Sequence, residues 1–319
     1  MKQLFLFLLL ISFSASAQNF SKVDKIIDAY PHFSQVEQLA NQIEKDFNTD
    51  LDKARATFYW LAKNIRYNLR ELYSPRKRGY RFSYATEEEK QQKLQAIKDK
   101  LVDDTFARKL GVCEEYAQSF KKVCDLIGVE AAVIKGYVRN DASEIGKIPN
   151  STNHAWNAVK IEGNWLILDA TWAAGYEYNN RWVQDFNDYF FDMPASKMFK
   201  THFPDDSLWV LRFGRIEIED FYNQPIYSNT FLRLNAELIS PQQGIIEVDS
   251  SNNIELKFKN LDTSHIIFYT YKGLRYAQKP VISKEEDLTT LSLKNPQRNT
   301  ELVLFINKND ALHFKIKSN

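Results

Sequence analysis

The chain has 319 residues, 44% of them hydrophobic, which is enough to bury the core of one large domain or two ordinary ones. Its 42 Lys and Arg residues nearly cancel 41 Asp and Glu residues, so the formal net charge is +1. This balance excludes a strong overall attraction to nucleic acid or to an anionic membrane. We expect a folded protein with no nucleic-acid partner, no cofactor and no metal, and the sequence leaves its oligomeric state open.

Residues 1–17 have the pattern of a secretory signal peptide. Lys2 gives a basic start, an apolar stretch runs from Leu4 to Phe13, and residues 15–17 are the small residues that a signal peptidase requires. The apolar stretch is shorter than the roughly 20 residues of a membrane-spanning helix. We therefore expect cleavage near Ala17 and an exported protein, periplasmic or extracellular, whose mature chain has no transmembrane segment.

The segment after the signal has mainly helical patterns. Residues 23–47 indicate two short helices separated at Tyr30-Pro31, because proline disfavours helical backbone in the residue before it. Apolar residues then recur at three- and four-residue intervals, which predicts a helix with one buried face. We expect Asp50 to cap this helix and the helix to end near Tyr67.

A second group of helices is expected between residues 86 and 128. A basic, aromatic loop over 68–85 comes first. Thr86 with Glu89 forms a capping box that opens a solvent-facing helix running through Lys100. Apolar spacing then predicts a helix that starts at or just before Cys113, with Gly128 as a helix stop.

Strand patterns follow this helix at residues 131–138, 155–161 and 165–168. The last two flank a short turn, across which we expect Glu162 to pair with Trp165. The order of helix first and sheet second indicates an α+β domain.

An aromatic-rich connector begins near residue 187, where the helical signals fade. From about residue 232, short alternating runs at 245–248, 254–258, 266–269 and 302–306 are typical of a small β-sandwich. We therefore predict a first domain over 18–225, with its N-terminal helices and connector, and an immunoglobulin-like, all-β sandwich over 232–319. A binding or spacer role is the natural expectation for the sandwich.

The two cysteines require separate explanations. Cys113 and Cys124 lie eleven residues apart in one predicted helix, which separates them by about 16 Å at 1.5 Å per residue, too far for a disulfide. Cys124 falls on the apolar stripe and is expected to be a buried hydrophobe. Cys113 falls at the helix N-terminus, where the backbone N–H groups favour a thiolate and can hold an oxyanion.

His154 and Asp169 are the candidate partners of Cys113. His154 is one of five histidines and begins a strand directly after a polar loop, whereas Asp169 closes an otherwise apolar strand. The expected strand pairing sets Asp169 opposite Ala158, about 13 Å from His154 at 3.3 Å per residue, so geometry alone does not join them. A metal site of Cys113, Cys124 and His154 is an alternative, but it lacks a short ligand spacing.

Three separated strings resemble the motif blocks of the transglutaminase-like superfamily, and in particular its kyphoscoliosis-peptidase-like branch. They are Gly111–Ala117, Asn153–Val159 and Gly163–Trp172, in the family order Cys, His, Asp. The resemblance implies a papain-like α+β core. It also implies that Cys113 is the nucleophile, His154 the general base and then acid, and Asp169 the residue that orients the imidazole.

The resemblance implies attack on an amide carbonyl of a polypeptide or peptide-like substrate, such as a cell-wall or extracellular protein, to give a thioester at Cys113. Hydrolysis makes the protein a peptidase or amidase, which we favour; transfer to an amine makes it a transglutaminase. A silent scaffold that binds protein or glycan is the non-enzymatic alternative. Many relatives use an upstream Trp as a second oxyanion donor, but none lies between Trp60 and Cys113, so this donor is unassigned, with Tyr84 as one guess.

Overall fold

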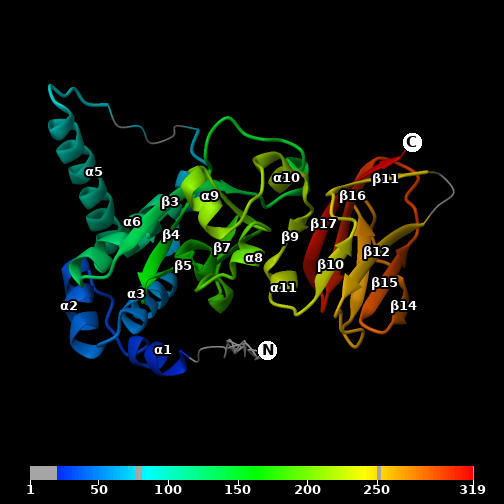
Figure 1. Cartoon of the computed structure of the whole chain (residues 1–319), viewed down its shortest axis with the longest axis horizontal. Helices are drawn as coiled ribbons and strands as arrows, with labels where there is room; N and C mark the ends of the chain where they lie inside the picture. The colour runs from blue at the N-terminus through cyan, green and yellow to red at the C-terminus, as the bar shows by residue number, and fades with distance from the viewer. Residues whose placement is uncertain (1–19, 76–78, 80, 250–252, 319) are drawn as a thin grey trace, which may run out of the picture.

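The computed structural model describes residues 20–75, 79, 81–249 and 253–318, so the predicted signal peptide lies outside the described residues. Helices α1, α2, α3, α5 and α6 lie at one end of the molecule, and a strand-rich unit forms the other (Figure 1). Each end has its own hydrophobic core, which confirms the predicted α+β unit followed by an all-β unit. In the described ranges, no helix has the length and apolar character needed to cross a membrane.

The N-terminal helices form largely where the sequence predicts them. Thr49 caps α3 in place of Asp50, because its hydroxyl accepts a hydrogen bond from the N–H of Asp52 at 3.1 Å. Thr86 caps α5 as predicted, but α5 extends beyond Lys100, and a short helix, α4, interrupts the predicted loop. The helices are α1 (Ser21–Ile27), α2 (Val36–Asp46), α3 (Asp50–Asn64), α4 (Leu69–Leu72), α5 (Glu87–Arg108) and α6 (Cys113–Leu126).

A four-stranded antiparallel sheet packs against α6. Its strands lie in the order β5, β4, β3, β8, with bounds β3 (Ala131–Val138), β4 (His154–Ile161), β5 (Asn164–Leu168) and β8 (His202–Pro204). The buried Asn157 amide of β4 donates to the carbonyl of Ala117 on α6 at 3.0 Å and to that of Ala132 on β3 at 3.1 Å. These bonds fix the helix that begins at Cys113 against the strand that begins at His154.

The predicted pairing of β4 with β5 is wrong. Ile161 pairs with Asn164, and the two residues between them, Glu162 and Gly163, have φ values of 49° and 84°. Two successive positive φ values match the tight turn that suits the right-handed twist of a hairpin. The turn has the predicted length but begins one residue earlier, so Asp169 lies closer to His154 along the sheet than the sequence predicts.

Short elements complete this half of the molecule. The predicted fading of helical signals is only partly correct, because four short helices lie between residues 195 and 232. The remaining elements of this half are β1 (Arg66–Tyr67), β2 (Leu110–Gly111), η1 (Ala142–Glu144), α7 (Ala170–Ala174), β6 (Gly175–Tyr178), β7 (Arg181–Gln184), η2 (Asp188–Phe190), α8 (Ala195–Met198), α9 (Ser207–Phe213), α10 (Ile218–Asn223) and α11 (Asn229–Leu232).

The C-terminal unit is a sandwich of two sheets around a shared apolar core. One sheet has the order β10, β12, β15, β14; the other has the order β11, β17, β16, β13, with β9 also paired to β17. The four predicted runs correspond to β11, β12, β13 and β16. The bounds are β9 (Ile226–Tyr227), β10 (Glu237–Ser240), β11 (Ile245–Val248), β12 (Ile254–Lys259), β13 (Ile267–Tyr271), β14 (Val281–Glu285), β15 (Leu288–Leu293), β16 (Thr300–Ile306) and β17 (Asn309–Ser318).

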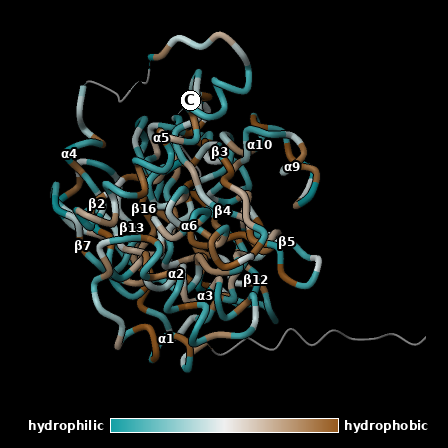
Figure 2. The backbone as a smooth tube through the Cα atoms, turned by 90° about the vertical axis from the view of Figure 1, so that its left-hand side faces the viewer, coloured by the Kyte–Doolittle hydropathy of each residue, from teal (hydrophilic) through white to brown (hydrophobic). Residues whose placement is uncertain are grey.

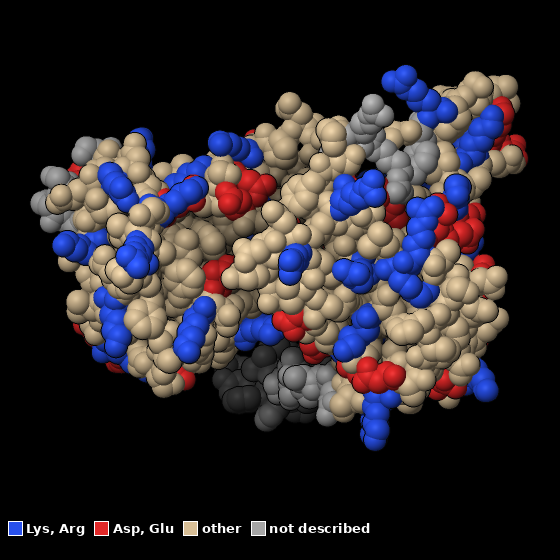
Figure 3. Space-filling model, turned by 180° about the vertical axis from the view of Figure 1, so that it is seen from behind, with Lys and Arg blue, Asp and Glu red and all other residues tan. Residues whose placement is uncertain are grey.

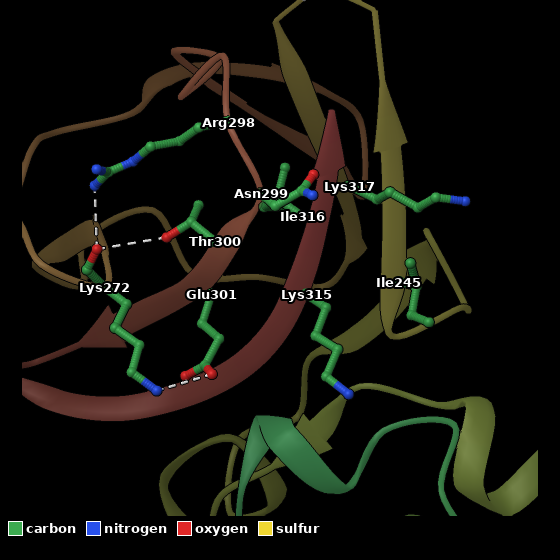
Figure 4. Close-up of a pocket in the computed structure, with 9 residues that line it drawn as sticks. All are labelled: Ile245, Lys272, Arg298, Asn299, Thr300, Glu301, Lys315, Ile316 and Lys317. Carbon is green, nitrogen blue, oxygen red and sulfur yellow. Dashed lines mark hydrogen bonds and ion pairs between the residues drawn. The ribbon is translucent and has the colours of Figure 1, made fainter. Parts of the chain in front are cut away.

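Polar contacts join the sandwich to the rest of the chain. Lys315 of β17 donates from Nζ to the carbonyls of Ser143 and Ile145, at 3.1 Å and 2.7 Å, beside η1 (Figure 4). The buried Arg139 donates to the carbonyl of Gln224 at 2.7 Å. Strand β9 pairs with β17, so chain before residue 232 already joins a sheet of the sandwich. The domain limits 18–225 and 232–319 stay a prediction.

Candidate active site

Cys113 begins α6 and is partly exposed. Gly111 makes this start possible, because a Cβ on it would lie 2.7 Å from the Cβ of Glu115. The carboxylate of Glu115 can then fold back and accept from the N–H of Val112 at 3.1 Å. The thiol therefore lies at the positive end of a helix, where unpaired N–H groups point outward.

His154 lies between Cys113 and Asp169, so the structure brings the three predicted residues together. Its Nε2 is 2.6 Å from Oδ2 of Asp169. An ionised carboxylate can only accept hydrogen bonds, so Nε2 donates and Nδ1 is left for the hydrogen bond with the Cys113 side chain. Asp169 is itself fixed as the cap of α7, since its Oδ1 accepts from the N–H groups of Thr171 and Trp172 at 2.8 Å and 3.1 Å.

The pair of His154 and Asp169 is buried and charged. Burial alone would lower the pKa of His154, but attraction to Asp169 and hydrogen bonds to Asp169 and Cys113 outweigh it and raise the pKa to about 10. Burial would raise the pKa of Asp169, but attraction to His154 and hydrogen bonds from His154 and His202 hold it well below its usual range. A protonated imidazole next to a cysteine favours the thiolate form of that cysteine, and His154 provides such a neighbour for Cys113.

His202 is the residue of this site that the sequence analysis missed. Its Nε2 donates to the same Oδ2 of Asp169 at 3.1 Å, and its Nδ1 lies 2.8 Å from the hydroxyl of Thr201. Burial lowers the pKa of His202, so Nδ1 of the neutral ring accepts from Thr201. His202 reaches the site through the pairing of β8 with β3, so no local sequence pattern indicates it. The small number of histidines, five in the chain, is the one signal that could have suggested it.

His154, Asp169 and His202 also form a cluster of metal-ligand types, with one ligand atom each within 4.8 Å of the others. Tetrahedral ligands about 2.0 Å from a zinc ion lie about 3.3 Å apart. The separations of 2.6 Å and 3.1 Å between Oδ2 and the two Nε2 atoms are instead hydrogen-bond distances. The alternative metal set with Cys124 is not assembled, because Cys124 is buried in the core of α6.

Aromatic rings cover the two imidazoles and exclude water from them. The ring of Trp156 stacks on His154 with centroids 6.0 Å apart, and Trp172 lies 4.8 Å from His202. Gly136, which pairs with His154, leaves the room for this packing, since a Cβ there would lie 2.6 Å from the Trp156 ring. This low-polarity wall strengthens the charge interactions of Asp169.

Tyr67 is a second residue that the sequence analysis did not assign to the site. It pairs with Gly111 across β1 and β2, and its ring stacks on Trp182 with centroids 5.3 Å apart. Burial, and then the negative charges that Cys113 and Asp169 can carry, raise the pKa of Tyr67 far above its usual value. The phenol therefore keeps its proton and can donate a hydrogen bond beside Cys113.

Tyr84, which the sequence suggested for that donor role, and Trp60, to which the role was not assigned, make other contacts. Trp60 is fully buried and stacks on Phe106 with centroids 5.3 Å apart, as its place in a buried helix pattern predicts. Tyr84 is half exposed and its ring lies 5.3 Å from the ammonium of Lys90.

Residues 37–170 match the model of the transglutaminase-like superfamily. This segment is a transglutaminase-like domain. The match confirms the predicted transglutaminase-like, papain-like core and includes Cys113, His154 and Asp169. His202 lies beyond it.

Relatives of the transglutaminase-like domain include kyphoscoliosis peptidase of Homo sapiens, which is 25% identical over 238 residues that cover 74% of this chain and 33% of that protein. Hillarin of Drosophila melanogaster is 24% identical over 247 residues, covering 71% of this chain and 27% of that protein. The crystal structure of a TGase has 18% identity and a TM-score of 0.26, covering 56% of this chain and 38% of the other. The chain spans about a third of the length of the curated relatives it matches.

Proposed function

We propose that the protein is a cysteine-dependent enzyme that attacks polypeptide amides and hydrolyses the resulting thioester. The proposal rests on two hydrogen bonds of His154, one with the side chain of Cys113 and one with the carboxylate of Asp169. Hydrolysis is favoured over amine transfer because a relative that matches 74% of the chain is named a peptidase. The silent-scaffold alternative has no structural observation in its favour, since all three reactive side chains are present and in contact.

The first half of the reaction forms the acyl-enzyme. With its proton on Nδ1 of His154, the thiolate sulfur of Cys113 attacks the amide carbon of the substrate. The carbonyl oxygen becomes an oxyanion, which the N–H of Cys113 can hold at the start of α6. When the C–N bond breaks, His154 returns its proton to the leaving amine and a thioester remains on Cys113.

The second half of the reaction releases the acid. His154 takes a proton from water, whose oxygen attacks the thioester carbon, and the C–S bond breaks to give a carboxylic acid and the Cys113 thiolate. Asp169 stabilises the imidazolium in both halves and holds the ring with Nδ1 toward Cys113. His202 acts as a positioning residue, because its bond to Oδ2 fixes the carboxylate rather than the substrate.

We assign Tyr67 as the second oxyanion donor. The assignment rests on its protonated phenol, on its pairing with Gly111 two residues before the nucleophile, and on the Trp182 ring that holds it. A donor that bonds the oxyanion more strongly than the ground-state carbonyl lowers the barrier to acylation.

The products formed from one labelled substrate test the proposed reaction. We expect the mature protein to cleave casein or a glutamine peptide in water, and to pass through a thioester at Cys113 that intact-mass spectrometry detects and hydroxylamine removes. Cys113→Ala and His154→Ala should abolish both signals. The matched control is Cys124→Ala, a thiol buried in the core that plays no part in the chemistry.

Two other outcomes would overturn parts of this proposal. Incorporation of a fluorescent primary amine at a rate far above hydrolysis would assign the protein to amine transfer. No thioester with any amide substrate, from a protein whose fold is intact by circular dichroism, would favour the scaffold alternative.

The Tyr67→Phe variant tests the second oxyanion donor. Removal of one donor should lower kcat by about 10²-fold while KM changes little, because the bond forms chiefly in the transition state. Steady-state kinetics of Tyr67→Phe measure this effect. Tyr84→Phe is the control variant and should leave kcat unchanged. An unchanged kcat in Tyr67→Phe would remove Tyr67 from the oxyanion site.

We also propose that the protein is exported, on the basic start and apolar stretch of residues 1–17. Expression of the full chain in a bacterial host, followed by N-terminal sequencing of the periplasmic fraction, should give a start near Gln18. A cytoplasmic product that retains Met1 would contradict export.

A further inference from the structure

A cavity of about 380 Å³ is lined by Tyr67 and by Leu110, which lies three residues before Cys113, and it has no assigned occupant. It is bounded by β1, the start of α4, β2 and the hairpin of β6 and β7, and Figure 2 shows α4, β2 and β7 gathered at one edge of the molecule. Its lining residues are Arg66, Tyr67, Asn68, Leu69, Leu110, Asn180, Arg181 and Trp182.

The chain sets an upper limit on the distance from Leu110 to the nucleophile. Leu110 lines the cavity and precedes Cys113 by three residues, which is about 10 Å of extended chain. Tyr67 lines the cavity too, and it is the proposed oxyanion donor. A peptide whose amide reaches Cys113 therefore has neighbouring side chains within reach of the cavity.

The charge of the lining is wholly positive. Arg66 and Arg181 are both exposed, and among the described residues neither guanidinium has a carboxylate partner. Glu71 lies nearby and accepts from the Asn68 amide at 3.1 Å, but it does not line the cavity. Two unpaired guanidinium groups at the edge of a cavity favour an anionic occupant.

A larger cavity in the sandwich, of about 530 Å³, shows the contrast. It too is lined by cations, and Figure 4 shows two of them in contacts within the fold: Lys272 with Glu301, and Arg298 with the carbonyl of Lys272. Lys272 pairs with Glu301 at 2.9 Å, Lys317 pairs with Glu247 at 2.7 Å, and Lys315 donates to main-chain carbonyls. Two of its four cations have a carboxylate partner and the other two donate to main-chain carbonyls, so this cavity gives a weaker reason for an anion to bind.

The overall charge of the molecule does not select an anionic ligand either. The net charge is +1, and on the face shown in Figure 3 Lys and Arg side chains are spread over both halves with Asp and Glu between them. A preference for anions near Cys113 must therefore come from the cavity itself.

We propose that this cavity binds a carboxylate of the polypeptide substrate, about three residues from the amide that Cys113 attacks. The inference rests on the proposed function and names the class of substrate: polypeptides with an acidic residue close to the reactive amide. The guanidinium groups of Arg66 and Arg181 bind the carboxylate, and the Trp182 ring with Leu69 and Leu110 covers the aliphatic part of the side chain.

Peptide binding to the full-length Cys113→Ala variant tests the proposal without turnover. Two fluorescein-labelled, C-terminally amidated peptides share a central Gln and differ only by Glu or Gln about three positions away. At low salt the Glu peptide should bind about five-fold more tightly in fluorescence anisotropy, as expected for exposed charge pairs. The difference should shrink at about 0.5 M salt. A third peptide with a free C-terminal carboxylate in place of Glu shows whether a side chain or a chain end is preferred.

Variants of Arg66 and Arg181 show whether these two residues cause the preference for the Glu peptide over the Gln peptide. Arg66→Gln with Arg181→Gln should bring the affinity ratio of the Glu and Gln peptides to about one, and Arg181→Gln alone should give an intermediate ratio. Arg275→Gln removes one charge from the sandwich, as Arg181→Gln does from the cavity, and should leave the ratio unchanged. Equal affinities in the parent, or a ratio that survives the double variant, would overturn the proposal. Because no thioester forms in Cys113→Ala, these results are independent of whether the proposed chemistry holds.

Discussion

The carboxylate of Asp169 accepts hydrogen bonds from two buried imidazoles, and the arrangement of the site depends on this shared acceptor. Oδ2 lies 2.6 Å from His154 and 3.1 Å from His202, while Oδ1 caps α7. One side chain thus joins the end of β5, the start of β4 and the edge strand β8. The ionised carboxylate accepts a hydrogen bond from Nε2 of His154, which keeps Nδ1 directed at Cys113. The charge of Asp169 therefore sets the orientation of the imidazole.

The site has a closed half and an open half with different physical properties. Trp156 and Trp172 pack on the imidazoles, so the charges of His154 and Asp169 interact in a medium of low polarity. Cys113 lies at a helix N-terminus on the partly exposed side, beside the cavity lined by Tyr67. The buried charge pair therefore lies in the closed half, and the partly exposed thiol lies in the open half.

The sequence predicts the parts of this site that local patterns control. Helical periodicity places Cys113 at the start of α6, as the structure confirms. The distance from His154 to Asp169 was overestimated, because strand pairing depends on the φ values of the turn residues Glu162 and Gly163. His202 could not be predicted, because the pairing of β8 with β3 joins segments that are distant in the sequence.

The rate of Cys113 alkylation as a function of pH tests the central claim most directly. Since the structure raises the pKa of His154 to about 10, an imidazolium lies beside the sulfur of Cys113 at both pH 6.5 and pH 8.5. We expect iodoacetamide to label Cys113 at similar rates at pH 6.5 and 8.5, with the site located by peptide mass spectrometry. An ordinary thiol of pKa about 8.5 loses most of its reactivity over this interval, by roughly 50-fold. The same loss at Cys113, unchanged in His154→Ala, would contradict the account.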